Sequence, residues 1–168
     1  MAYLLDANVF IQAKNMHYDM EICPAFWDWL LREHGRGVVL SIAEVGHELA
    51  HGEDALTEWA AARGARFFLP PDPQVISAIN RVANWFQSQT QYETAAASTF
   101  LGRADHLLVA HALAHGHTVV THERAADSRR IVKIPNPCNA LGVPCITPFQ
   151  MLREERARFV LSPNLDRS

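Results

Sequence analysis

The chain of 168 residues has few cysteines and no long apolar run. Its cysteines, Cys23, Cys138 and Cys145, are odd in number and lack the paired spacing of a zinc site, so we expect free thiols in a reducing compartment. No segment approaches the roughly 20 apolar residues of a membrane-spanning helix, and the start MAYLLDANVF has neither a basic leader nor a long apolar stretch. The sequence therefore predicts a cytoplasmic protein without a membrane segment.

Positive charge is also scarce, because 15 Lys and Arg against 18 Asp and Glu give a formal net charge of -3. Such a protein does not hold nucleic acid through its overall field and would need a local patch or a bound cation. The chain lacks a Gly-rich phosphate loop, a nucleophile elbow and a dinucleotide fingerprint, so kinase, esterase and dehydrogenase functions have no support. Its length fits a single domain over residues 1–168.

Short apolar runs alternate with helical patterns along the chain. We expect strands at 3–5, 38–40, 117–121 and 131–134, the last followed by a Pro/Asn loop. Helices are expected to begin at Pro24 and Pro148 and to cover about 42–51, 54–63, 73–87 and 104–114. Ser41 is the expected N-cap of the 42–51 helix, and residues 88–103 fit either a loop or a continued helix. The predicted fold class is α/β, a three-layer α/β/α sandwich with a central, mostly parallel sheet.

Four acids stand out by where they lie in this pattern. Two come just past strand ends and two lie on helices beside the sheet: Asp6, Glu123, Glu48 and Asp105. In a parallel sheet, ligands bind beyond the carboxyl ends of the strands, where all four can converge. Clustered carboxylates repel one another unless a cation neutralises them, and their oxygens suit Mg²⁺ or Mn²⁺. Singly, each acid has a simpler explanation as a helix cap or a solvated side chain. The combination predicts metal-assisted phosphodiester chemistry.

Three segments in order carry a resemblance to a known family. The stretches LLDANVFI, SIAEVGHEL and RADHLLVAHALAHGHTVVTHE resemble the PIN-domain ribonucleases, of which toxins of the VapC type are familiar examples. The start DAN-x-FI, the FWDWL stretch and the run Leu56-Thr57-Glu58-Trp59 are similar to a PIN-like subfamily of prokaryotic proteins. The resemblance covers essentially the whole chain.

The resemblance implies specific roles and a specific reaction. Its catalytic, metal-binding acids fall on Asp6, Glu48, Asp105 and Glu123, with Asn8 and Thr121 as supporting polar groups. The family more often has aspartate at the last position, so direct or water-mediated contact of Glu123 with the metal is open. Glu44, one helical turn before Glu48, is a reserve ligand. The implied activity is endonucleolytic cleavage of single-stranded or structured RNA with Mg²⁺ or Mn²⁺, in a homodimer. A toxin would also have an antitoxin encoded by a neighbouring gene.

A second motif favours a different enzyme. His47-Glu48-Leu49-Ala50-His51 matches H-E-x-x-H, in which two histidines one turn apart bind zinc and the glutamate acts as a base. Gly52 ends the helix directly after the second histidine, and no third ligand follows at a suitable spacing. The zinc peptidase is therefore the weaker alternative, and it shares Glu48 with the nuclease. A third reading keeps the fold as an RNA-binding module without catalysis.

Two further clusters have open interpretations. His111, His115 and His117 resemble a metal cluster, but surface histidines without a further ligand are the more common case. Basic residues follow the fourth acid and precede the third, and they are candidates for guiding RNA phosphates toward the metal: Arg129, Arg130, Lys133 and Arg103.

Overall fold

The computed structural model describes residues 1–161 and contains a five-stranded sheet in the order β3-β2-β1-β4-β5. Every pair of neighbouring strands is parallel. The strands are β1 (Tyr3–Leu5), β2 (Val39–Ile42), β3 (Phe68–Leu69), β4 (Thr118–Val120) and β5 (Cys145–Ile146). The prediction of one domain over residues 1–168 includes residues 162–168, which lie outside the described residues.

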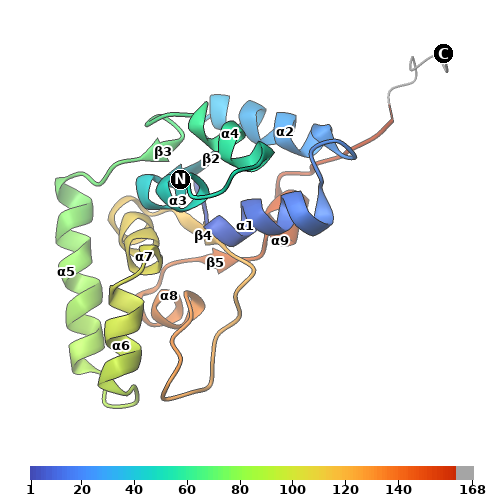
Figure 1. Cartoon of the computed structure of the whole chain (residues 1–168). Helices are drawn as coiled ribbons and strands as arrows, with labels where there is room; N and C mark the ends of the chain where they lie inside the picture. Colours follow the sequence, from blue (N-terminus) through green and yellow to red (C-terminus); the bar gives the residue numbers. More distant parts are fainter. Residues whose placement is uncertain (162–168) are drawn as a thin grey trace, which may run out of the picture.

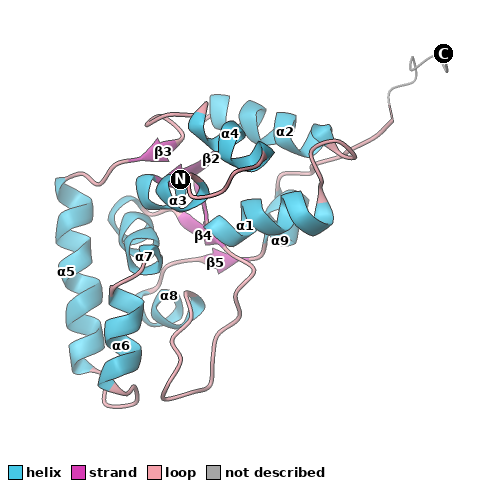
Figure 2. Cartoon of the chain, viewed as in Figure 1, coloured by secondary structure: helices cyan, strands magenta, loops and turns pink. Residues whose placement is uncertain are grey.

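Helices cover both faces of this sheet, as Figures 1 and 2 show. One side carries α1 (Ala7–Gln12), which continues into a π-helical turn at Ala13–His17, together with α2 (Pro24–Gly35), α4 (Ala55–Ala61) and α9 (Pro148–Glu154). The other side carries α5 (Pro73–Ser88), α6 (Thr94–Leu101), α7 (Ala104–His115) and α8 (Pro135–Leu141). Helix α3 (Ala43–Leu49) contacts α1, α4 and α7. The predicted three-layer α/β/α class is confirmed.

The three central strands are apolar because both of their faces are covered. Side chains on both faces of these strands are fully buried, at 0% exposure: Leu4, Leu5, Val39, Ile42, Val119 and Val120. Burying such side chains on both sides of a parallel sheet removes apolar surface from water and stabilises the fold. Within residues 1–161, none of the helices has the length and apolar character that crossing a membrane requires.

Several helix boundaries follow from capping groups. Asp54 caps α4 by accepting from the N–H groups of Leu56 and Thr57, and Asp72 caps α5 by accepting from Val75 N at 2.9 Å. Ser41 does not cap α3 as predicted. Its buried hydroxyl instead donates to Leu5 O at 2.6 Å, so it ties β2 to β1. Helix α3 also ends at Leu49, two residues earlier than the predicted end at His51.

The predicted strand at 131–134 is wrong, because this segment forms no strand in the structure. Its backbone N–H groups are bound by side chains: Lys133 N donates to Asn136 Oδ1 at 2.9 Å, and Ile134 N donates to Glu123 Oε2 at 2.8 Å. The predicted Pro/Asn loop that follows is helix α8, and the fifth strand comes later, at Cys145–Ile146. Residues 88–103, left open between loop and helix, contain α6 at Thr94–Leu101.

The direction in which strands are added to the sheet reverses at one position, between β1 and β4. From β1 the chain moves outward through β2 to β3, then returns to add β4 on the other side of β1. The carboxyl ends of β1 and β4 therefore adjoin where the order reverses, and parallel α/β sheets bind ligands at such points.

Candidate functional site

Asp6 lies at this reversal point, directly after β1 and before α1. It is 7% exposed, and its side chain forms no capping hydrogen bond with α1. Its carboxylate is held by the residue that follows β4 instead, because the Thr121 hydroxyl donates to Asp6 Oδ2 at 2.8 Å. Asp6 thus occupies the N-cap position of α1 and accepts from Val9 N through its backbone carbonyl, but its carboxylate does not cap the helix.

Thr121 is the centre of a small polar network. Its Oγ1 accepts hydrogen bonds from Asn8 Nδ2 at 3.1 Å and from Glu123 N at 3.0 Å. Asn8 Oδ1 in turn accepts from His122 N at 3.1 Å. The two residues predicted as supporting groups, Asn8 and Thr121, thus fix the backbone after β4 and orient the Asp6 carboxylate.

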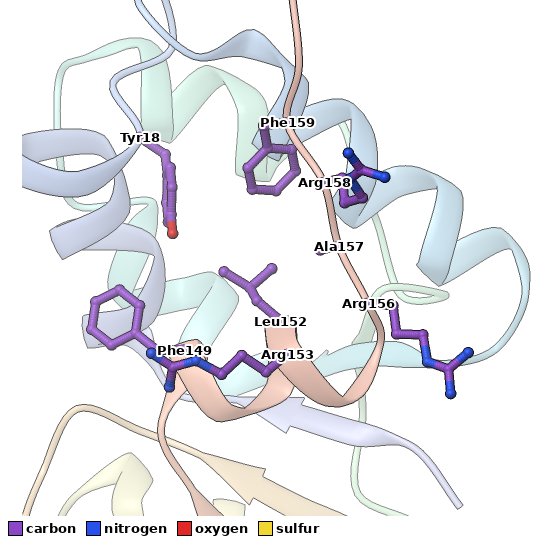
Figure 3. A pocket seen from close by; sticks show the side chains of 8 residues that line it. All are labelled: Tyr18, Phe149, Leu152, Arg153, Arg156, Ala157, Arg158 and Phe159. Atoms are coloured by element: carbon purple, nitrogen blue, oxygen red, sulfur yellow. The ribbon is translucent and has the colours of Figure 1, made fainter.

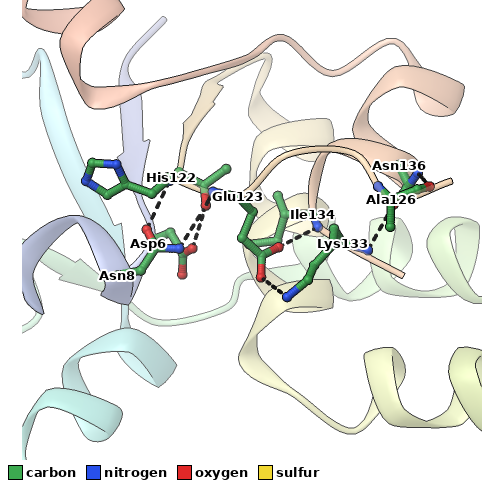
Figure 4. A network of polar contacts seen from close by, with 9 residues as sticks. Asp6, Asn8, His122, Glu123, Ala126, Lys133, Ile134 and Asn136 are labelled. Carbon is green, nitrogen blue, oxygen red and sulfur yellow. Dashed lines mark hydrogen bonds and ion pairs between the residues drawn. The ribbon is translucent and has the colours of Figure 1, made fainter. Parts of the chain in front are cut away.

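Glu123 faces the loop before α8. Its Oε1 accepts from Lys133 Nζ at 3.0 Å, and its Oε2 accepts from Ile134 N at 2.8 Å (Figure 4). Both oxygens of the carboxylate are therefore engaged by the protein. This arrangement gives Glu123 a structural function in holding residues 133–134 beside the site.

The four acids influence one another electrostatically. Burial, together with the charges of Asp105 and Glu123, raises the pKa of Asp6 to about 7, although the Thr121 hydrogen bond opposes the rise. Burial, together with the charges of Glu123 and Glu48, raises the pKa of Asp105 to about 6, although Arg103 and Lys133 oppose it. Asp6, Asp105 and Glu123 are thus within electrostatic reach of one another, and Glu48 is within reach of Asp105.

Glu48 and Glu44 approach the cluster from α3. They line one open depression of about 480 Å³ with Arg103 at the start of α7. Glu48 is exposed, and its charge acts on Asp105, whereas one oxygen of Glu44 is buried without a hydrogen-bond partner in the described part of the chain. Glu48 therefore faces the cluster, and Glu44 lies beside it.

The oxygen atoms near Asp6, at this edge of the sheet, are of the kind that binds hard cations. Carboxylates, the Thr121 hydroxyl and the Asn8 amide supply oxygen, which Mg²⁺ and Mn²⁺ prefer, and a cation would relieve the repulsion that raises the two pKa values. Among residues 1–161, no three His, Cys, Asp or Glu side chains lie close enough together to hold an ion as they stand. A cation would have to draw the exposed Glu48 and the half-buried Asp105 toward Asp6.

The histidine motifs are arranged differently from a zinc site. His51 lies beyond the end of α3, and its Nδ1 is 2.7 Å from the His47 carbonyl oxygen. In the second cluster, His115 Nε2 pairs with Asp72 Oδ2 at 2.8 Å, and His117 Nδ1 accepts from Ala2 N at 3.1 Å. The H-E-x-x-H residues do not share an uninterrupted helix. The rings of His115 and His117 lie 5.7 Å apart, but each has a ring nitrogen engaged by another group.

Three of the four predicted RNA-binding residues lie together near Asp105. Arg103, Arg130 and Lys133 line a pocket of about 310 Å³ that also contains Asp105. Arg130 pairs with Glu93 at 3.3 Å, and Lys133 pairs with Glu123. Arg129 is separate, because its side chain lines another pocket, with Tyr92 and Asn136.

Sequence reasoning did not find Asn136, which holds the loop opposite the acids. Its side chain bonds Ala126 through both the N–H and the carbonyl, at 3.2 and 3.0 Å, and also accepts from Lys133 N. The only local signal is an asparagine between two prolines, in Pro135-Asn136-Pro137, which was interpreted as a loop.

The chain belongs to the family described as "Domain of unknown function (DUF4411)", whose model matches residues 3–159. No curated protein matches the chain, and no solved structure matches it. The matched span includes all four acids and the polar network around Thr121.

Proposed function

We propose that the protein is a metal-dependent endoribonuclease of PIN type that hydrolyses RNA phosphodiester bonds in the cytoplasm. The observation that carries the proposal is the electrostatic coupling of Asp6, Asp105 and Glu123 near the point where the strand order reverses, with Glu48 acting on Asp105. Raised carboxylate pKa values at such a place are typical of functional sites. The free thiols of Cys23, Cys138 and Cys145 are compatible with a reducing compartment.

In this proposal, Asp6, Asp105 and Glu48 hold Mg²⁺ or Mn²⁺, and Glu123 supports the site from the side. When bound, the cation supplies polarisation of the phosphodiester and activation of water. Thr121 and Asn8 keep the Asp6 carboxylate turned toward the edge of the sheet. Because the pKa of Asp6 is about 7, its carboxylate carries a proton below neutral pH and loses it to become a ligand. Activity should therefore rise through pH 7.

The basic pocket supports an anionic substrate. Arg103, Arg130 and Lys133 lie beside Asp105 in a chain whose net charge is negative, so they provide the local patch that RNA binding requires. Their charge would attract phosphates to the acids and offset the repulsion between them. The expectations of a toxin function, an antitoxin and a homodimer stay predictions.

The experiment incubates the full chain with labelled single-stranded RNA in Mg²⁺ or Mn²⁺ and compares Asp6→Asn with Asp28→Asn. Asp28 is an exposed acid on α2, on one face of the sheet, so the same chemical change there is the matched control. We expect cleavage to fall at least about 100-fold in Asp6→Asn, to be unchanged in Asp28→Asn, and to stop with EDTA.

Other outcomes identify the alternatives. Bound zinc, together with casein hydrolysis that depends on His51 and not on Asp6, would show a peptidase. RNA binding without cleavage in any metal, by a folded protein, would show a binding module. Cleavage that survives Asp6→Asn at full rate would reject the proposed site.

A further inference from the structure

A further pocket, of about 420 Å³, lies between the end of the π-helical turn and the segment that follows α9 (Figure 3). We call it the α9 pocket. Its residues of interest are three aromatic and three basic side chains: Tyr18, Phe149, Phe159, Arg153, Arg156 and Arg158. Among residues 1–161, no acidic residue lines it. Its chemistry is therefore the reverse of the carboxylate cluster.

The aromatic rings form a wall of this pocket. The Tyr18 ring stacks on the buried Phe26 ring with centroids 4.5 Å apart, and Phe159 packs edge-on against Tyr18 at 5.6 Å. Tyr18, Phe149 and Phe159 are each only partly buried, so part of each ring faces the solvent. Aromatic faces held rigidly from behind are platforms on which unpaired bases stack.

The three arginines add positive charge around this wall. All are exposed, and none forms an ion pair within residues 1–161, in contrast to Arg32 and Arg36, which pair with Glu33. In Figure 3 Arg153 extends toward Phe149, whereas Arg156 and Arg158 project outward from the segment on the opposite side, at the rim of the pocket. Guanidinium groups without an ion pair in this part of the chain, at the rim of an aromatic pocket, suit a base with phosphates on either side of it.

Arg156 occupies a position where glycine is usual. It is the residue after the C-cap of α9 and has φ 52°, the sole positive φ among non-glycine residues of the described chain. The bonds from Arg156 N to Arg153 O and from Ala157 N to Leu152 O are those of a Schellman motif. Glycine suits this conformation best, so Arg156 can be exchanged for glycine without adding backbone strain.

A line of rings connects the α9 pocket to the carboxylate cluster. Phe149 lies 5.6 Å from the ring of His122, and both contact His17, at 5.1 and 5.5 Å. His122 is the residue whose N–H is bound by Asn8, next to Thr121 and Asp6. A strand leaving the acids along His122 would therefore reach Phe149 and the pocket within a few side chains.

We propose that the α9 pocket binds an unpaired base of an RNA strand and that its arginines bind the flanking phosphates, which holds the strand for cleavage at the acids. This inference rests on the proposed function for its ligand. The pocket assigns the substrate as single-stranded on the α9 side of the cut, because a paired base cannot stack on Tyr18, Phe149 or Phe159.

The test measures binding in EDTA, where cleavage is off, by the anisotropy of a labelled single-stranded oligoribonucleotide of mixed sequence. The variants are Arg153→Gln, Arg156→Gly and the control Arg81→Gln, an exposed arginine on α5, across the sheet. We expect each pocket variant to bind about 3- to 10-fold more weakly and to lower the salt dependence by about one ion, with Arg81→Gln unchanged.

The variant Arg156→Gly separates a loss of RNA binding from a loss of folding. Glycine suits the positive φ, so this variant should unfold at the same or a higher urea concentration while binding RNA more weakly. An RNA duplex of the same sequence should compete poorly. Pocket variants that bind like the wild type, or a duplex that competes equally well, would overturn the proposal. So would concentration-dependent dimerisation that is lost in Arg153→Gln while RNA affinity is kept, since the occupant would then be a second copy.

Cleavage assays separate this inference from the proposed function. If the wild type cleaves RNA and the pocket variants raise KM at unchanged kcat, both stand. If the wild type cleaves and the pocket variants bind and cleave normally, only the pocket assignment fails. If no metal supports cleavage but the pocket variants lose affinity, the nuclease fails and the RNA pocket stands.

Discussion

The Thr121 hydroxyl donates a 2.8 Å hydrogen bond to Asp6 Oδ2 and so joins the ends of β4 and β1. The same oxygen accepts from Asn8 and from the backbone of Glu123. One side chain therefore organises the polar groups around the most buried acid of the cluster.

Replacing Thr121 with valine should destabilise the protein by about 2 kcal/mol, because the Asn8 amide and the Glu123 N–H lose their acceptor in a partly buried place. It should also raise the pKa of Asp6 further, since a hydrogen bond to the carboxylate is lost. Urea unfolding measures the first effect. Thr118→Val is the matched control, because Thr118 is also buried and its hydroxyl forms no side-chain hydrogen bond within residues 1–161. Equal effects at both positions would contradict the prediction.

The raised pKa values of Asp6 and Asp105 predict how stability depends on pH. Between about pH 4 and pH 7 the folded, metal-free protein binds more protons than the unfolded chain. Stability contributed by these groups is therefore full below about pH 4 and is lost as pH rises through 6 and 7, by on the order of 3 kcal/mol. Urea unfolding in EDTA across this range measures it.

The Asp6→Asn variant tests the assignment of this effect. It should flatten the curve and leave the variant more stable than the wild type at pH 8, because the asparagine side chain carries no charge to bury. Added Mn²⁺ should stabilise the wild type at pH 8 more than the variant. Parallel curves for the two proteins would show that Asp6 is not the titrating group.

Glu123 should control the order of the loop before α8. Glu123→Ala removes the acceptor of Ile134 N and the partner of Lys133 Nζ, so the amide of Ile134 should exchange with solvent at least about 10-fold faster. Glu123→Gln keeps an oxygen acceptor and should retain most of the protection. Hydrogen exchange measured by NMR distinguishes the two, and similar exchange in Ala and Gln variants would contradict a structural role.

Gly46 should tolerate no side chain. A Cβ there would lie 2.9 Å from Cγ of Phe68, so Gly46→Ala should destabilise the contact between α3 and β3 by about 1 to 3 kcal/mol. Gly35→Ala is the control, because a Cβ at the end of α2 meets nothing within 4 Å. It should be neutral or stabilise by about 0.5 kcal/mol. Thermal unfolding of the pair measures the difference.

The sequence located the four acids on the fold better than it located the outer strands of the sheet. Asp6 and Glu123 could be placed because each follows a buried apolar strand, and Asp105 because it opens a clear helix. The strands β3 and β5 have two residues each, too few for any periodicity. Residues 131–134 were misassigned because side chains of Asn136 and Glu123, not a neighbouring strand, bind their backbone.

The α9 pocket could not be predicted from local patterns. Tyr18 and Phe159 meet across 141 positions of the chain (159 minus 18), and Phe149 joins them from the start of α9. The cluster of arginines in 153–158 is visible in the sequence, but it is interrupted by Glu154 and Glu155 and has a low net charge. The folded structure directs Glu154 away from the pocket, because its carboxylate accepts a hydrogen bond from the Tyr3 hydroxyl at 2.8 Å.

The position of β4 beside β1 also has a consequence for synthesis on the ribosome. Asp6 leaves the exit tunnel early, but its partner Thr121 follows 115 residues later. The chain between these two residues must bring its ends together before β1 and β4 can pair, and pairing between residues so far apart in the sequence is slow. A nascent or truncated chain that ends before residue 118 therefore lacks β4 and cannot assemble the carboxylate cluster. The cluster forms only after most of the protein has been made.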